Sequence, residues 1–143
     1  MKILLTGATG FVGKALLKKL IEAEYYTSIV SRKLGEPRAL VEQMLLESID
    51  ERTSWLSKLL GKTIVIHCAA RVHVMSDDTK DPLTSFREVN TTGTLNLARQ
   101  SAKAGVKRFI YISSIKVNGE STTESIPFTE KDIPNPLDPY GVS

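Results

Sequence analysis

The sequence has only one cysteine, Cys68, so no disulfide can form within the chain. Chains without disulfides are typical of reducing compartments, and we therefore expect a cytoplasmic protein. Long apolar runs are absent as well, since a membrane-spanning helix needs about 20 apolar residues in a row. The first apolar run, at residues 3–5, gives way at once to Thr6 and Gly7, which fits no signal peptide. We expect no association with a membrane.

The sequence also has little excess charge of either sign. Nineteen lysines and arginines stand against 16 aspartates and glutamates, a formal net charge of +3, and both signs are scattered. A nucleic acid partner calls for concentrated positive charge, so we expect none. Histidine is scarce too, with two residues, and the spacing of His67, Cys68 and His73 matches no usual zinc pattern. We read His67 as a core residue and expect no metal site.

The residues that are present alternate between two patterns. Short apolar runs, typical of buried strands, are followed by segments whose apolar positions recur every three or four residues, typical of helices. This alternation predicts an α/β fold: a doubly wound parallel sheet of about five strands, covered by helices. The predicted strands are residues 3–5, 26–31, 44–49, 63–67 and 107–112, and the predicted helices are residues 12–23, 55–60 and 82–104.

The third predicted helix has clear signals at both ends. Asp81 can cap its N-terminus, Pro82 fits its first turn because no N–H is needed there, and Gly105 ends it. After Gly119 we expect only loops, because prolines block regular structure at positions 127, 134, 136 and 139.

A glycine-rich turn links the first strand to the first helix. Gly7 can turn the chain sharply, Gly10 lets backbone approach a pyrophosphate, and Gly13 lets helix and strand pack closely. The N–H groups of Phe11 and Val12 then point toward the anion, aided by the helix dipole. The turn therefore predicts a site for a nicotinamide dinucleotide, against the alternative of a tight turn in an unrelated α/β protein.

The end of the second strand bears on which dinucleotide binds. An acidic residue there would bind the ribose hydroxyls and repel a 2′-phosphate. This sequence instead has Ser31, Arg32 and Lys33, a hydroxyl and two cations that suit a 2′-phosphate. We expect NADP(H) to be preferred, with NAD(H) possible; the alternative is a solvated basic turn.

The glycines at 7, 10 and 13, in the run TGATGFVG, resemble those of the short-chain dehydrogenase/reductase superfamily. The similarity is to its extended branch, which contains nucleotide-sugar epimerases, dehydratases and ketoreductases. The resemblance implies a Rossmann-type fold and further cofactor-binding residues. A segment after the fourth strand passes beneath the cofactor, an asparagine in an N-x-x-G-T pattern touches it, and two residues lie near the adenine. These residues are Cys68, Ala69, Ala70 and Arg71, then Asn90, then Ser48 and Ile49.

Two of these positions carry further expectations. Gly93, in the same pattern as Asn90, costs a helix about 1 kcal/mol relative to alanine, so we expect close packing there. Ile49 stands where relatives carry an acidic residue, a departure from the family pattern.

The resemblance also implies an acid–base pair. In this family a serine after the fifth strand and the tyrosine of a Y-x-x-x-K motif carry the chemistry, which here implies Ser114 and Tyr140 as catalytic residues, with Tyr140 also touching the cofactor. The lysine would be residue 144, one position after Ser143. A tyrosine side chain ordinarily titrates near pH 10, and a neighbouring ammonium favours the phenolate. We therefore expect residues 1–143 alone to bind cofactor better than they catalyse.

The run Ser113 to Glu120 resembles a bacterial subgroup that acts on UDP-linked acetamido sugars. The resemblance implies an NADP(H)-dependent 4-ketoreductase or 4-epimerase of a nucleotide sugar, active in surface polysaccharide synthesis. Alternatives are a reductase of a non-sugar ketone and a non-catalytic NAD(P)-binding module. We expect residues 1–143 to form an incomplete N-terminal NAD(P)-binding domain without the substrate domain. An uncovered sheet edge would then favour self-association, for example as a homodimer.

Overall fold

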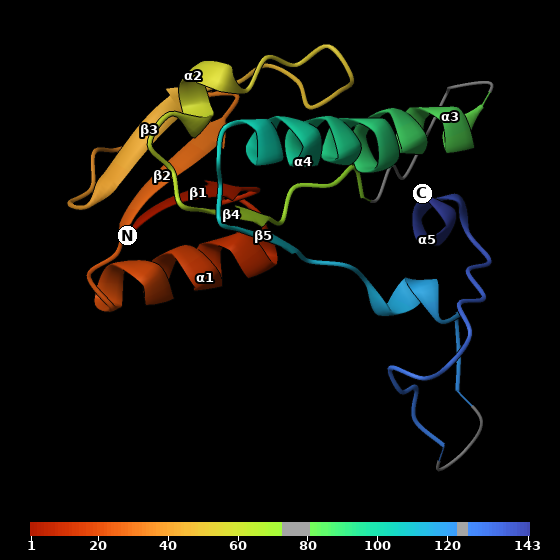
Figure 1. Cartoon of the computed structure of the whole chain (residues 1–143). Coiled ribbons are helices and arrows are strands. Elements are labelled where there is room, and N and C mark those ends of the chain that lie inside the picture. Colours follow the sequence, from red (N-terminus) through yellow and green to blue (C-terminus); the bar gives the residue numbers. More distant parts are fainter. Residues whose placement is uncertain (73–80, 123–125) are drawn as a thin grey trace.

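The structure is a computed structural model that describes residues 1–72, 81–122 and 126–143. Within these residues the strands form one sheet in the order β3-β2-β1-β4-β5, and every neighbouring pair is parallel (Figure 1). The predicted doubly wound α/β fold is confirmed. The strands are β1 (Lys2–Thr6), β2 (Tyr26–Ser31), β3 (Val41–Leu45), β4 (Ile64–His67) and β5 (Arg108–Tyr111).

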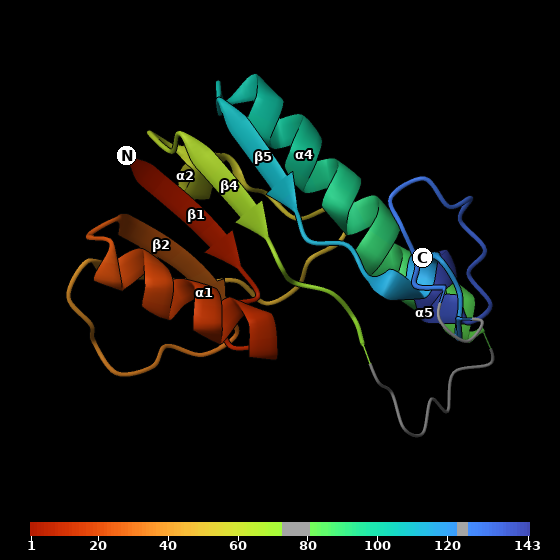
Figure 2. The ribbon, with the colours of Figure 1, turned by 90° about the horizontal axis from the view of Figure 1, so that it is seen from below.

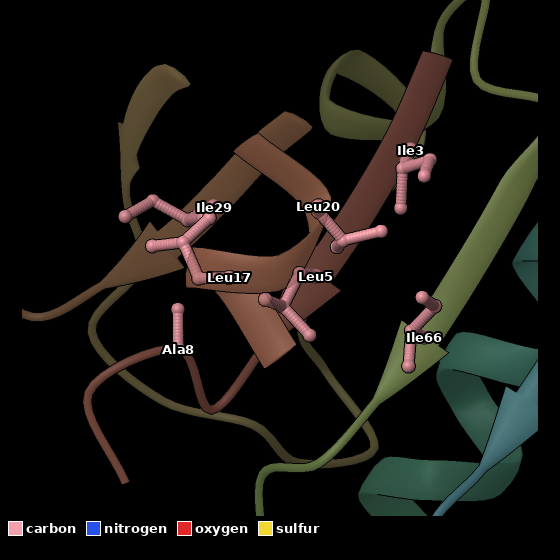
Figure 3. Close-up of a cluster of buried hydrophobic side chains, with 7 residues drawn as sticks. All are labelled: Ile3, Leu5, Ala8, Leu17, Leu20, Ile29 and Ile66. Carbon is pink, nitrogen blue, oxygen red and sulfur yellow. The ribbon is translucent and has the colours of Figure 1, made fainter. Parts of the chain in front are cut away.

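Strand β1 lies at the centre of the sheet because both of its faces are apolar. Successive side chains of a strand point to opposite faces, so Ile3 and Leu5 enter one core cluster and Leu4 enters the other. Helix α1 (Phe11–Glu22) covers the first cluster, where Leu17 and Leu20 pack on the sheet (Figure 3). Helices α2 (Leu56–Leu59) and α4 (Thr94–Lys103) cover the opposite face (Figure 1).

The third helix has the predicted ends but an unexpected middle. Asp81 caps it by accepting a hydrogen bond from the Thr84 N–H at 3.2 Å, and Gly105 follows its last turn with a positive φ of 78°. Between α3 (Pro82–Arg87) and α4, however, the backbone widens into a π-helix, η1 (Glu88–Gly93). No helix of the described residues, this one included, is long and apolar enough to cross a membrane.

The predicted close packing at Gly93 is confirmed. A Cβ at this position would lie 2.9 Å from both the carbonyl oxygen and the Cγ2 atom of Ile49. The loop after β3 therefore presses directly on the widened turn, and only a glycine leaves room for it.

Strand β3 was placed wrongly at residues 44–49: it covers Val41–Leu45. Its limits are set by its partner, because Val41 pairs with Thr27 and Leu45 pairs with Ser31, the last residue of β2. Leu46 makes one more backbone bond to the Ser31 carbonyl and then leaves the sheet. The apolar run that begins at Met44 therefore continues to Leu46, one residue beyond the end of β3, because β2 ends at Ser31.

The prediction that only loops follow Gly119 was also wrong. A helical turn, α5 (Pro139–Val142), forms where Pro139 needs no N–H and Asp138 caps the turn. The C-terminal segment brings α5 against α3 (Figure 2).

Before Gly119, a 3₁₀ turn, η2 (Ile115–Val117), follows β5.

His67 ends β4 and is fully buried, with hydrogen-bond partners at both ring nitrogens. Its Nδ1 lies 2.6 Å from the Thr6 hydroxyl and its Nε2 lies 2.9 Å from the Thr94 hydroxyl. Burial lowers the pKa of His67 to about 4. The ring is thus a neutral core link between β1 and α4, in line with its interpretation as a core residue; His73 lies outside the described residues.

This burial predicts a pH dependence of folding. Between pH 6.5 and about 4 the unfolded chain binds a proton at His67 and the folded chain does not, so stability falls as the pH falls through this window. The difference between the two pKa values corresponds to a loss of at most roughly 3–4 kcal/mol once the pH has fallen below both. Urea unfolding at pH 7 and pH 4.5 measures it. The variant His67→Gln should show a clearly smaller difference between the two pH values, and an equal difference would contradict the assignment.

Candidate functional site

The glycine turn is held in place by close backbone contacts on two sides. Gly7 has a φ of +70°, and a Cβ there would lie 2.6 Å from the Ala69 nitrogen. A Cβ at Gly13 would lie 2.0 Å from the Gly7 carbonyl oxygen, which also accepts a hydrogen bond from Gly10 at 3.0 Å. The turn is therefore pressed between α1 and the segment after β4, and side chains at Gly7 and Gly13 would force it open.

Helix α1 directs its N-terminus to this turn. Gly10 is the N-cap residue and has no side chain to cap the first turn, which contains no acidic residue either. The N–H groups of Phe11 and Val12 therefore begin a 12-residue helix whose positive end is not neutralised within its first turn. Phe11 is 94% exposed. The glycine turn thus leaves the backbone of its glycines without side chains next to the N-terminus of α1, whose N–H groups can bind an anion. This arrangement suits a pyrophosphate.

The residues predicted for the adenosine end lie in two loops. At the end of β2 the Ser31 hydroxyl donates to the Lys33 carbonyl at 2.5 Å, and Arg32 and Lys33 are exposed. The Ser48 hydroxyl donates to the Asp50 carboxylate at 2.6 Å, the main reason that the pKa of Asp50 is lowered. Ile49 packs under Gly93 instead of presenting a polar group.

The segment after β4 is tied to the π-helix through Asn90. The Arg71 N–H donates to Asn90 Oδ1 at 2.8 Å, and Asn90 Nδ2 donates back to the Arg71 carbonyl at 3.1 Å. The same Nδ2 donates to the Ser143 hydroxyl at 2.8 Å. Asn90 thus joins three segments that are distant in the sequence, and the guanidinium of Arg71 lies 5.7 Å above the Phe86 ring.

The predicted serine and tyrosine share one small cavity of about 40 Å³. Ser114 and Tyr140 line it together with Ala70 and Asn90. The remaining lining residues come from the end of β5, η2 and α5: Tyr111, Ile112, Ser113, Val117, Gly141 and Ser143. The structure therefore brings the predicted acid–base pair together with part of the segment that also touches the glycine turn.

A second hollow, of about 540 Å³, does not contain these residues. It lies between the loop after β3 and the start of the long helix, and none of the predicted site residues lines it. Its lining is mostly charged: Asp50, Glu51, Arg52, Thr84, Arg87, Glu88 and Thr92. We therefore place the candidate site in the smaller cavity.

Tyr111 is a residue of the site that the sequence did not single out. Its ring stacks on His67, with ring centres 5.9 Å apart, and it lines the cavity beside Tyr140. Partial burial, followed by the nearby charge of Tyr140, raises the pKa of Tyr111, whose side chain is still about half exposed. Its place at the carboxyl end of a parallel strand, where such sheets bind ligands, was the available signal.

The model of the NAD dependent epimerase/dehydratase family matches residues 3–143. The chain belongs to this family.

Two relatives illustrate the range of similar proteins. A UDP-glucose 4-epimerase of Vibrio cholerae is 48% identical over 143 residues, covering 99% of this chain and 43% of the relative. The methionine adenosyltransferase 2 subunit beta of Mus musculus is 33% identical over 141 residues, covering 98% of this chain and 39% of the relative. The chain therefore spans less than half the length of these relatives.

The solved structures agree with the fold. MoeE5 in complex with UDP-glucuronic acid and NAD matches with a TM-score of 0.83 and 26% identity, covering 99% of this chain and 45% of that one. The resemblance to the extended short-chain dehydrogenases/reductases is thus confirmed, as is the Rossmann-type architecture.

The tight approach of α1 predicts that Gly13→Ala destabilises the fold. A Cβ only 2.0 Å from the Gly7 oxygen cannot fit without movement of the helix or the turn. Overpacking of this kind costs about 1–3 kcal/mol, measured as the free energy of unfolding in urea. Gly35→Ala is the matched control, because its Cβ would meet Gln43 Oε1 at an ordinary 3.6 Å. Equal losses in the two variants would contradict the close approach.

Proposed function

We propose that the chain is the NAD(P)-binding N-terminal portion of an enzyme that acts at C4 of a nucleotide sugar, as a 4-epimerase or a 4-ketoreductase. The observation that carries the proposal is the cavity shared by Ser114 and Tyr140. Ala70 lines that cavity, and the neighbouring Ala69 touches the glycine turn. The family membership of the chain supports the reaction class.

The two cavity residues have distinct roles. The Ser114 oxygen accepts a hydrogen bond from the Lys116 N–H at 3.3 Å, which leaves its own O–H to donate to the sugar C4 oxygen. Tyr140 takes the proton from that oxygen during oxidation and returns it during reduction. A bound nicotinamide dinucleotide supplies the acceptor and donor of the C4 hydride. The Phe86 ring lies 6.3 Å from the Tyr140 ring and backs it on one side.

A sugar nucleotide is the substrate class best supported by the relatives. The relative with 48% identity is named for UDP-glucose, and MoeE5 was solved with UDP-glucuronic acid. Ketoreduction for surface polysaccharides is the finer part of the proposal and rests on the Ser113 to Glu120 run. The similarity to a protein named as a subunit of methionine adenosyltransferase favours a non-catalytic NAD(P)-binding module as the second candidate.

Tyr140→Phe tests the catalytic role. In the whole protein of which these residues form part, we expect the conversion of UDP-glucose or UDP-N-acetylglucosamine to fall by at least about 100-fold, because the proton carrier is lost. Cofactor affinity, measured by fluorescence titration, should stay near that of the parent. Tyr26→Phe, a change on the exposed N-terminal end of β2, is the control. Retained turnover in Tyr140→Phe would refute the acid–base assignment, whereas a parent protein that binds the cofactor but converts neither sugar nucleotide would favour the non-catalytic module.

The second part of the proposal is a preference for NADP(H). It is supported by the exposed cations Arg32 and Lys33 after β2, whereas solved relatives such as MoeE5 contain NAD. We expect the chain to bind NADPH more tightly than NADH in a calorimetric titration. A lost charge-assisted contact is worth about 1.5–3 kcal/mol, so Arg32→Ala should reduce the preference about tenfold or more. Arg38→Ala, an exposed arginine elsewhere, should not; equal affinities in the parent would end this part of the proposal.

A further inference from the structure

Lys116 lies between the two residues of the proposed acid–base pair. It belongs to η2, the turn that begins directly after Ser114. Its backbone N–H donates to the Ser114 hydroxyl oxygen, so its position and that of the serine are coupled. On its other side, its carbonyl oxygen lies against Gly141, where a Cβ would be 2.8 Å away. The turn of the serine and the helix of the tyrosine are therefore in direct backbone contact here.

The side chain of Lys116 extends this contact to Asp138. Its ammonium group lies 3.1 Å from Asp138 Oδ2 and also pairs with Glu120. The other oxygen of Asp138, Oδ1, accepts a hydrogen bond from the Gly141 N–H at 2.6 Å and so caps α5. One carboxylate thus binds the cation after the serine and the helix turn that contains Tyr140.

Both partners are charged at neutral pH. Glu120 and then Asp138 raise the pKa of Lys116, while the Gly141 N–H and then Lys116 lower the pKa of Asp138. Each side chain is about one third exposed, at 36% and 35%. Exposed ion pairs add little to folding stability, so stability alone does not account for this arrangement.

The neighbouring chain adds a second link between the two segments. The Asn135 N–H donates to the Val117 carbonyl at 2.9 Å. Residues 135 and 138 on one side and 116 and 117 on the other thus form a clasp, which we call the Lys116–Asp138 clasp. The clasp joins the residues that follow Ser114 to the residues that precede Tyr140.

We propose that Lys116 and Asp138 are positioning residues, which fix the separation and orientation of Ser114 and Tyr140 through the clasp. The inference rests on the proposed function, because it assigns the pair a role in the reaction of those two residues. Neither side chain lines the cavity, so neither contacts the substrate through it. A misplacement of reacting groups by about 1 Å can lower the rate by up to about 100-fold. A positioning role would therefore change kcat strongly, although the loss of an exposed ion pair changes folding stability little.

The test compares Lys116→Met and Asp138→Asn in the whole protein with Lys131→Met as the matched control. Lys131 is an exposed lysine between the two segments. Asparagine is as good an N-cap as aspartate, so Asp138→Asn removes the ion pair and keeps the cap. We expect kcat to fall about tenfold in either variant, with the KM for cofactor unchanged. The double variant should be no worse than either single one, because both remove the same interaction.

Two further readouts separate positioning from mere stability. Lys116→Arg keeps the charge and should restore most of the lost kcat. In the chain of residues 1–143 without cofactor, the ring NMR signals of Tyr140, assigned with Tyr140→Phe, should shift in Lys116→Met and Asp138→Asn but not in Lys131→Met. The chain has four tyrosines, which makes this assignment practical.

The outcomes distinguish the two proposals. If Tyr140→Phe abolishes turnover while Lys116→Met and Asp138→Asn keep the parent kcat, the clasp has no positioning role and the proposed function stands. If Tyr140→Phe leaves turnover intact, the acid–base assignment fails, and the clasp has no such pair to position. If the parent protein converts no nucleotide sugar, the proposed function itself fails. Should Lys116→Met fail to fold, Asp138→Asn alone decides, and a kcat equal to that of Lys131→Met would overturn the inference.

Discussion

The approach of helix α1 to the turn after β1 is the contact on which the rest of the site depends. Gly13 on the helix touches the carbonyl of Gly7, and Gly7 in turn touches the backbone of Ala69. Three layers are stacked here without intervening side chains. The third layer continues to Arg71, whose backbone Asn90 holds, so an unbroken series of contacts joins the glycine turn to the cavity of Ser114 and Tyr140.

The sequence predicted best those elements whose limits are local. Helix α1 and strand β2 follow from apolar periodicity and from their own flanking residues, and their bounds were predicted to within a residue. Strand β3 was misplaced because its end depends on where β2 ends. The π-helix was missed because a local widening of a helix leaves no periodic signal in the sequence, and Ile49, which packs on its last residue Gly93, lies 44 positions away.

The residues of the candidate site also fall into those that a local sequence pattern predicts and those that depend on contacts between distant segments. Gly7 and Gly13 could be singled out from the sequence because glycine adopts a positive φ without steric cost and has no Cβ to prevent a backbone contact within 3 Å. The resemblance supplied Ser114 and Tyr140, and the structure places both on one cavity, while their chemical roles remain predictions. The position of Tyr111 and the pairing of Lys116 with Asp138 depend on how β5 and α5 meet, which no local pattern encodes.

The parallel arrangement of the sheet also has a consequence for the order of events during synthesis. The central strand β1 is made first, yet Ile3 pairs with Ile64, 61 positions later. A ribosome adds about 5–20 residues per second, so this apolar strand waits several seconds for its second partner. Until then its edge is open to other chains, and pairings this distant close slowly. The same central place that buries β1 on both faces in the folded protein leaves it open to aggregation while the chain is nascent.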